Sequence, residues 1–173
     1  MQAVINANTQ ALEQILSLIA CAKGKIYSEV PQGMTSAIGR HVRHVLDHYS
    51  ALQIGIKKNE IDYDLRSRDS EVETDPSLAV DKINKTMEWM QVHIRLDAPL
   101  LMKTEVSLNC QETCVVESSL KRELVYLLNH TVHHVAYITL VLRMLGITVD
   151  QHVGIAPATQ SYIRSNDNIK QVG

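Results

Sequence analysis

The sequence has no phenylalanine, one tryptophan and only three cysteines. Three is an odd number, and a chain of 173 residues is long enough to build its own hydrophobic core, so a disulfide framework is not predicted. We expect Cys110 and Cys114 to be free thiols, because a CxxxC pair without a second pair is a weak indication of a zinc site. Free thiols favour a reducing cytoplasm.

Long apolar runs are also missing. The longest, Val135 to Leu142, is too short to span a bilayer, and residues 1–10 lack the basic segment that opens a secretion signal. We therefore expect a cytoplasmic protein that has no contact with a membrane.

Neither sign of charge is in large excess. The chain has 17 lysine and arginine residues against 19 aspartate and glutamate residues, and the basic residues do not cluster. Because phosphate binding needs a concentrated positive field, nucleic acid is not an expected partner. With 45% apolar residues and a mean hydropathy of -0.07, the composition is that of one soluble globular domain. We place this domain at residues 1–163 and expect residues 164–173 to be a polar tail.

Several catalytic motifs are missing as well. The sequence contains no glycine-rich phosphate loop, no nucleophile elbow and no pair of carboxylates on one helical face beside the histidines, so covalent catalysis by the protein is unsupported. His130 and His134 have the spacing of a zinc protease helix, but Thr131 stands where that motif needs a glutamate as general base. We therefore reject a metalloprotease.

Hydrophobic periodicity predicts four helices, at residues 3–27, from 35 or 36 to 56, at 75–94, and from 118 or 119 to 145. Thr35 or Ser36 can cap the second helix, and Asp75 followed by Pro76 suits the start of the third. The charged stretch 57–75 predicts a polar loop, whereas short β-branched runs at 101–108 and 113–117 predict a hairpin. The predicted fold is therefore all-α, a four-helix bundle with a small β-hairpin between the third and fourth long helices.

The fourth predicted helix is apolar around nearly its whole circumference. Such a helix either occupies the centre of a small bundle or contributes to a subunit interface. The second possibility leads us to expect a homodimer.

Histidine is what the sequence has in excess: there are eight, and six of them lie in two short clusters. His41, His44 and His48 are spaced by three and four in the second predicted helix, so their side chains project from one face. His130 and His134 are four apart on one stripe of the fourth helix. We expect the two helices to present these imidazoles to a common core.

Five imidazoles on two inward faces predict a metal site. One buried histidine is usually a core residue whose ring nitrogens find hydrogen bonds. Several buried side by side cannot all be charged and cannot satisfy one another well, whereas a divalent metal accepts three neutral imidazole lone pairs at once. Three protein ligands also leave a position for water, as in catalytic sites.

Three runs of the sequence resemble the DinB/YfiT-like superfamily: 36–48 (SAIGRHVRHVLDH), 62–69 (DYDLRSRD) and 130–134 (HTVHH). The resemblance extends from the first predicted helix to about Tyr162. It implies a four-helix bundle, often dimeric, in which one histidine of the second helix and the two of an HxxxH motif in the fourth hold a divalent metal. Carried onto this sequence, the resemblance implies that the ligands are His44, His130 and His134.

Other residues near these positions have open roles. His48, one turn beyond His44, is a candidate for the true ligand, a fourth ligand or an acid/base beside a bound water. Glu123, on the stripe of His130 and two turns nearer the N-terminus, is the second candidate catalytic residue. His41 and His133 are expected to be partners of the ligands or core residues. Arg66 or Arg68 could hold an anionic group of a substrate, but a loop whose charges pair with one another is the favoured alternative.

One function and one alternative follow. The function is a divalent-metal-dependent enzyme, with zinc or nickel, that activates water or a low-molecular-weight thiol cosubstrate for transfer to a small electrophilic substrate. The resemblance favours thiol transfer, because the superfamily includes thiol-dependent S-transferases and isomerases. The alternative is a non-catalytic dimeric stress protein that binds a metal or a small ligand, and the fold alone does not separate the two.

Overall fold

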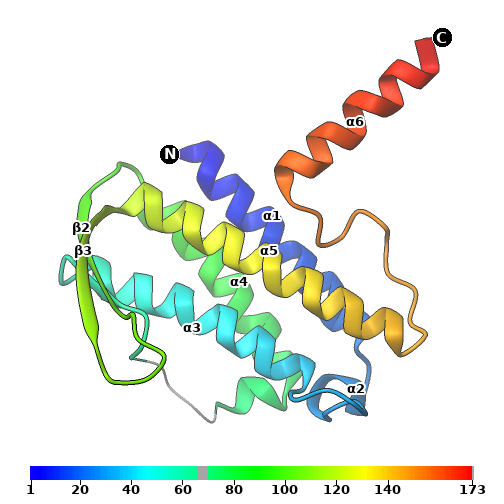
Figure 1. The fold of residues 1–173 in the computed structure, drawn as a ribbon, viewed down its shortest axis with the longest axis horizontal. Coiled ribbons are helices and arrows are strands. Elements are labelled where there is room, and N and C mark those ends of the chain that lie inside the picture. The colour runs from blue at the N-terminus through cyan, green and yellow to red at the C-terminus, as the bar shows by residue number, and fades with distance from the viewer. Residues whose placement is uncertain (66–69, 173) are drawn as a thin grey trace.

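The structure is a computed structural model that describes residues 1–65 and 70–172, with side chains described through residue 166. Its body is built from four long helices: α1 (Gln2–Cys21), α3 (Ile38–Ile56), α4 (Pro76–His93) and α5 (Leu120–Met144). Both α1 and α3 pack against α4 and α5 (Figure 1).

One hydrophobic core joins these four helices. Leu12, Leu46, Ile83 and Leu127 are fully buried, and each comes from a different long helix. Burial of one such side chain stabilises the fold by about 1.5–3 kcal/mol. The shared core therefore determines which faces of α3 and α5 meet.

The first predicted helix is two helices. Gly24 adopts a φ of 59°, which a residue with a side chain rarely does, and the chain turns there before the short helix α2 (Lys25–Ser28). The turn buries Tyr27, whose hydroxyl donates a 2.7 Å hydrogen bond to the carbonyl of Val72. A continuous helix over residues 3–27 is therefore not formed.

A small mixed sheet lies at one end of the helices (Figure 1). Its strands β2 (Pro99–Glu105) and β3 (Thr113–Ser119) pair antiparallel and form a hairpin. The strand β1 (Glu60–Asp62) joins the other edge of β2 in parallel, with Ile61 opposite Met102. Ile61 is fully buried against Gly55 at the end of α3, and this contact anchors the sheet to the helices.

The prediction of an all-α four-helix bundle is wrong. Within the described residues there are six α-helices, the 3₁₀ turn η1 (Glu71–Glu73) and a three-stranded mixed sheet. The strand β1 and the turn η1 both lie in the stretch predicted to be a loop. The sequence did not predict β1, because its pairing with β2 is non-local and leaves no periodic signal. Helix α6 (Pro157–Val172) extends away from the other helices (Figure 1), and the boundary proposed between residues 163 and 164 falls inside it.

Within the described ranges, none of the helices combines the length and the apolar character that a bilayer crossing requires.

Candidate metal centre

The two histidine clusters meet where α3 packs on α5. His41, His44 and His48 lie on successive turns of α3, and His130 and His134 lie on successive turns of α5. The ring centroid of His44 is 5.0 Å from that of His130 and 4.9 Å from that of His134. Helical spacing keeps each set on one face, and the packing of the helices brings the two faces together.

A buried hydrogen-bond network holds α3 and α5 in register beside the histidines. The hydroxyl of Tyr49 donates to the side-chain oxygen of Asn8 at 2.7 Å and lies 3.1 Å from the hydroxyl of Thr131. Asn8, Tyr49 and Thr131 are fully buried. Because Tyr49 follows His48 in the chain and Thr131 follows His130, this network fixes the relative positions of the two histidine faces.

His44, His130 and His134 form a group whose candidate ligand atoms all lie within 4.8 Å of one another. His134 is buried and the other two are half-buried. Around a tetrahedral zinc ion with bonds of about 2.0–2.1 Å, two nitrogen ligands stand about 3.3 Å apart. Three imidazole nitrogens are a donor set that divalent cations accept, and the three side chains would have to draw closer together to bind one ion.

The electrostatics of the site favour neutral imidazoles. Burial first, and then the neighbouring rings of His130 and His41, lower the pKa of His134 to about 3. Burial and then the charge of Arg40 lower the pKa of His41 as well. The uncharged ring is the form that offers a lone pair to a metal.

His41 lies in direct contact with His134. The Nδ1 atoms of the two rings are 3.1 Å apart, and Nε2 of His41 is 2.7 Å from the hydroxyl oxygen of Ser36. The ring of His41 also lies 4.2 Å from that of Tyr137. His133, which the sequence groups with His41, is exposed, and its ring centroid is 5.3 Å from that of His134.

His48 lies beside the three-histidine group and not within it. Its Nδ1 donates a 2.9 Å hydrogen bond to the backbone carbonyl of His44. Its ring centroid is 4.2 Å from that of His130, and on another side it stacks on Tyr63 at 5.3 Å. Since Nδ1 is the donor to a carbonyl, Nε2 is the nitrogen through which a neutral His48 would accept a proton.

Glu123 is fully buried in the first turn of α5, where donors surround it. Tyr63 donates to one carboxylate oxygen at 2.7 Å, while Arg122 at 2.8 Å and the hydroxyl of Ser118 donate to the other. Burial first, and then the hydrogen bond to Glu123, raise the pKa of Tyr63, which keeps its hydroxyl a donor. Glu123 is therefore linked to His48 indirectly: it accepts a hydrogen bond from Tyr63, and the ring of Tyr63 stacks on His48.

Sequence reasoning missed the two tyrosines of this site. The ring of Tyr126 is stacked near His130 at 5.8 Å and lies 5.2 Å from the ring of Tyr63. Because Tyr126 stands four residues before His130, helical spacing could have placed it on this face. Tyr63 follows a three-residue strand, and no local pattern points to its partners.

The other candidates lie elsewhere. Arg66 and Arg68 fall outside the described residues. Cys110 is a free thiol in the turn of the β2–β3 hairpin, and Cys114 is a free thiol in strand β3, opposite Thr104.

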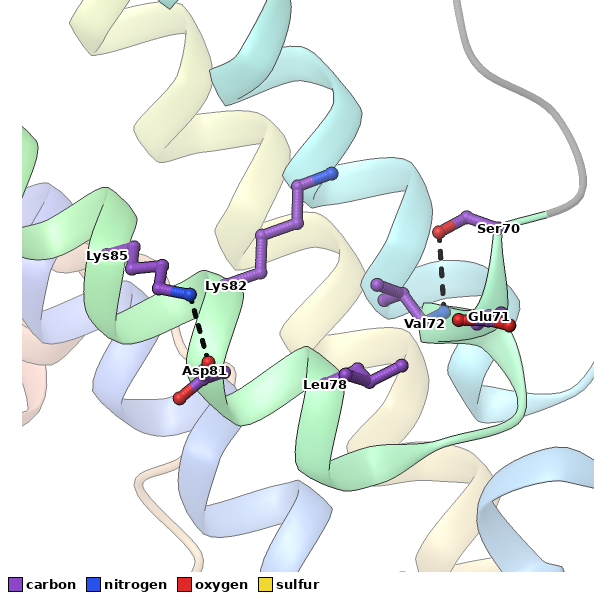
Figure 2. Close-up of a pocket in the computed structure, with 7 residues that line it drawn as sticks. All are labelled: Ser70, Glu71, Val72, Leu78, Asp81, Lys82 and Lys85. Carbon is purple, nitrogen blue, oxygen red and sulfur yellow. Dashed lines mark hydrogen bonds and ion pairs between the residues drawn. The ribbon is translucent and has the colours of Figure 1, made fainter.

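A pocket of about 350 Å³ opens between η1 and α4 (Figure 2). The ammonium group of Lys85 pairs with Asp81 at 3.0 Å, and that of Lys82 lies 3.9 Å from the carboxylate of Asp47 on α3. The described lining residues include no histidine, so this pocket is separate from the candidate metal centre. They are Ser70, Glu71, Val72, Leu78, Asp81, Lys82 and Lys85.

Comparison with known proteins leaves the family open. No protein-family model matches the chain, and no solved structure matches it. The chain is 32% identical over 106 residues to FK506-binding protein 5 of Rhizopus delemar. The shared segment is 60% of this chain and 28% of that protein, so the chain spans well under a third of this relative.

Proposed function

We propose that this protein binds one divalent metal ion, zinc or nickel, through His44, His130 and His134, and that it is a metal-dependent enzyme related to the DinB/YfiT-like superfamily. The observation that carries the proposal is the convergence of three imidazoles from two helices, with candidate ligand atoms within 4.8 Å of one another. The lowered pKa of His134 supports it, because a ligand must be neutral.

The chemistry follows from an open three-histidine site. A bound ion would supply Lewis acidity, which lowers the pKa of a water or of a low-molecular-weight thiol and prepares it for transfer to a small electrophilic substrate. The resemblance of the sequence favours the thiol over water. His48 is the residue that we assign to proton transfer, since its ring lies 4.2 Å from His130 and its Nδ1 is already committed to a carbonyl.

Glu123, which the sequence made a candidate catalytic residue, takes a different role in this proposal. Both of its carboxylate oxygens accept hydrogen bonds from Tyr63, Ser118 and Arg122. Its effect on the site passes through Tyr63, whose ring stacks on His48. Glu123 is therefore a positioning residue.

We extend the proposal to a homodimer located in the cytoplasm. Exposed apolar side chains on α5 support self-association: Val125 is 41% exposed, Leu140 55% and Met144 66%. Three free cysteines support a reducing compartment.

The similarity to the Rhizopus delemar protein does not enter the proposal. Its name refers to the binding of FK506. Because the shared segment is 28% of that protein, we do not extend this activity to the present chain.

Metal content tests the proposal directly. Protein purified after expression with supplemented zinc or nickel should carry about one ion per chain, and His44→Ala, His130→Ala and His134→Ala should each lose it while helical circular dichroism is unchanged. His93→Ala and His133→Ala, which remove exposed histidines, are matched controls that should retain it. Negligible metal in the wild type, or full retention in the three ligand variants, would overturn the proposal.

Turnover separates the enzyme from the binding protein. Metal-loaded protein is incubated with small electrophiles and a panel of cellular thiols, and product formation is followed with and without EDTA. Loss of turnover with EDTA and in His130→Ala supports the enzyme. Stoichiometric metal with no turnover across the panel supports the non-catalytic alternative.

A further inference from the structure

His41 and His134 contact each other through the Nδ1 atom of each ring. Their Nδ1 atoms are 3.1 Å apart, which is a hydrogen-bond distance, although both belong to imidazoles. A hydrogen bond between them requires that one Nδ1 carries a proton and the other offers a lone pair. The second nitrogen of His41 is 2.7 Å from the hydroxyl of Ser36, so His41 is held on both sides.

The direction of this hydrogen bond decides whether His134 can bind a metal. If Nδ1 of His134 were the acceptor, the proton of the neutral ring would sit on Nε2, and no lone pair would remain for a cation. If Nδ1 of His134 is the donor, Nε2 keeps its lone pair, and His41 accepts on Nδ1 and donates from Nε2 to the hydroxyl of Ser36. Every contact in the chain from His134 to Ser36 then has one donor and one acceptor.

We propose that His41 is a positioning residue for His134, which it holds in the Nδ1–H form with Nε2 presented to the three-histidine group, and that Ser36 anchors His41 in this role. The inference rests on the proposed function, because the reverse direction, in which Ser36 donates to His41 and His41 donates to His134, satisfies the same two contacts and differs only in leaving Nε2 of His134 without a lone pair for a metal. Its effect on the proton of His134 exists in the metal-free protein as well.

The start of α3 supports the anchoring role of Ser36. Ser36 is of the residue type that caps helices, and the sequence offers Thr35 or Ser36 as the cap. In the structure Ala37 is the N-cap residue and no side chain caps α3, while the hydroxyl of Ser36 lies against His41. A hydroxyl that could have capped the helix is therefore committed to a ring of the site. The ring of Tyr137, 4.2 Å away, further limits the orientation of His41.

His133 provides the contrast that makes the inference testable. It neighbours His134 in the chain, and its ring centroid lies at the same 5.3 Å from that of His134 as the centroid of His41 does. It is exposed, whereas His41 is half-buried and hydrogen-bonded to His134. A nonspecific effect of removing an adjacent imidazole would appear equally in His41→Ala and His133→Ala.

The first measurement is made on metal-free protein at neutral pH by nitrogen-15 NMR of the imidazole rings. In the wild type and in His133→Ala we expect His134 to be protonated on Nδ1 and not on Nε2. In His41→Ala this preference should be lost, and in His41→Gln, whose amide oxygen can accept from Nδ1–H, it should return. An unchanged tautomer in His41→Ala would overturn the inference, whether or not the protein binds metal.

The second measurement is the affinity for Zn²⁺ alone by competition with a chelator. His41→Ala should bind about 10–100-fold more weakly, as loss of an outer partner of a ligand does, and His41→Gln should recover most of this loss while His133→Ala stays near the wild type. If His41→Ala does not fold, Ser36→Ala gives the same test with a smaller change. Unchanged affinity, or a cobalt spectrum showing that His41→Ala has lost one ligand nitrogen, would overturn the positioning role. Failure of the wild type to bind any metal would instead defeat the proposed function, and the tautomer measurement would still decide this inference.

Discussion

The hydroxyl of Tyr63 donates a 2.7 Å hydrogen bond to the buried carboxylate of Glu123. Tyr63 follows β1 at the edge of the sheet, whereas Glu123 lies in the first turn of α5, so the bond ties two elements that are 60 residues apart. The same tyrosine ring stacks on His48 at 5.3 Å. The strand β1, which the sequence did not predict, thus places Tyr63 beside the histidines of the candidate site.

Removal of the Tyr63 hydroxyl should destabilise the protein. In Tyr63→Phe the fully buried carboxylate of Glu123 loses a donor, and an unsatisfied buried polar group costs about 1–3 kcal/mol. Urea unfolding should show this decrease in the free energy of unfolding. Lys85→Gln, which breaks the exposed ion pair with Asp81, is the control and should change stability by less than about 0.5 kcal/mol. Equal stability of Tyr63→Phe and the wild type would show that the hydrogen bond is not maintained in solution.

The lowered pKa of His134 predicts a loss of stability in acid. An ordinary histidine titrates at 6.5, and His134 in the folded protein titrates at about 3. Between these values the unfolded chain binds a proton that the folded chain does not, so the free energy of unfolding falls as the pH falls, by about 1.4 kcal/mol per pH unit for one such group. Above about pH 6.5 both states are neutral and the effect disappears.

Urea unfolding of metal-free protein between about pH 5 and pH 8 measures this slope. His134→Gln removes the titrating group and should reduce the slope below about pH 6.5, whereas His93→Ala, which removes an exposed histidine, should leave it unchanged. The same slope in His134→Gln and the wild type would mean that other groups cause the acid sensitivity.

Local periodicity was sufficient to predict which residues share a helical face. His44 and His48 on one helix, and His130 and His134 on the other, follow from spacings of three and four, and the fold brings these faces together. The contacts between the rings depend on how α3 and α5 are rotated and shifted along their axes. That relation is set by the packing of the core and by the contact between the hydroxyls of Tyr49 and Thr131, neither of which leaves a local pattern.

The strand β1 and the helix α6 illustrate the other limit. Glu60–Asp62 lies in a charged stretch with one buried apolar residue, Ile61, and it becomes a strand only because β2 pairs with it from about 40 residues away. Helix α6 forms in a polar segment, where no apolar stripe indicated a packed helix. Ser36 shows the same limit within the site, because its residue type predicts a helix cap and the fold gives its hydroxyl to His41.

Gly39 in α3 should not tolerate a side chain. Replacement of glycine by alanine inside a helix usually stabilises it by about 1 kcal/mol. A Cβ atom on Gly39, however, would stand 2.0 Å from the backbone oxygen of Glu73 and 2.8 Å from the ring of Tyr27. Gly39→Ala should therefore lower the free energy of unfolding by about 1–3 kcal/mol, as overpacking does. Gln53→Ala on the same helix is the control, and a Gly39→Ala protein more stable than the wild type would contradict the close approach of η1 to α3.

Removal of Arg43 alone should destabilise the protein strongly, because it leaves a buried carboxylate without its ion-pair partner. Its guanidinium pairs with Asp47 at 2.6 Å and with Glu73 at 2.7 Å, and the side chains of Arg43 and Asp47 are 8% and 5% exposed. Arg43→Ala leaves the Asp47 carboxylate buried with only the distant Lys82, so the free energy of unfolding should fall by about 3–5 kcal/mol. The double variant Arg43→Met with Asp47→Leu removes both charges and fills the space, and urea unfolding should show that it is more stable than Arg43→Ala alone. If the double variant is the less stable of the two, the unpaired carboxylate of Asp47 is not the main cost of Arg43→Ala.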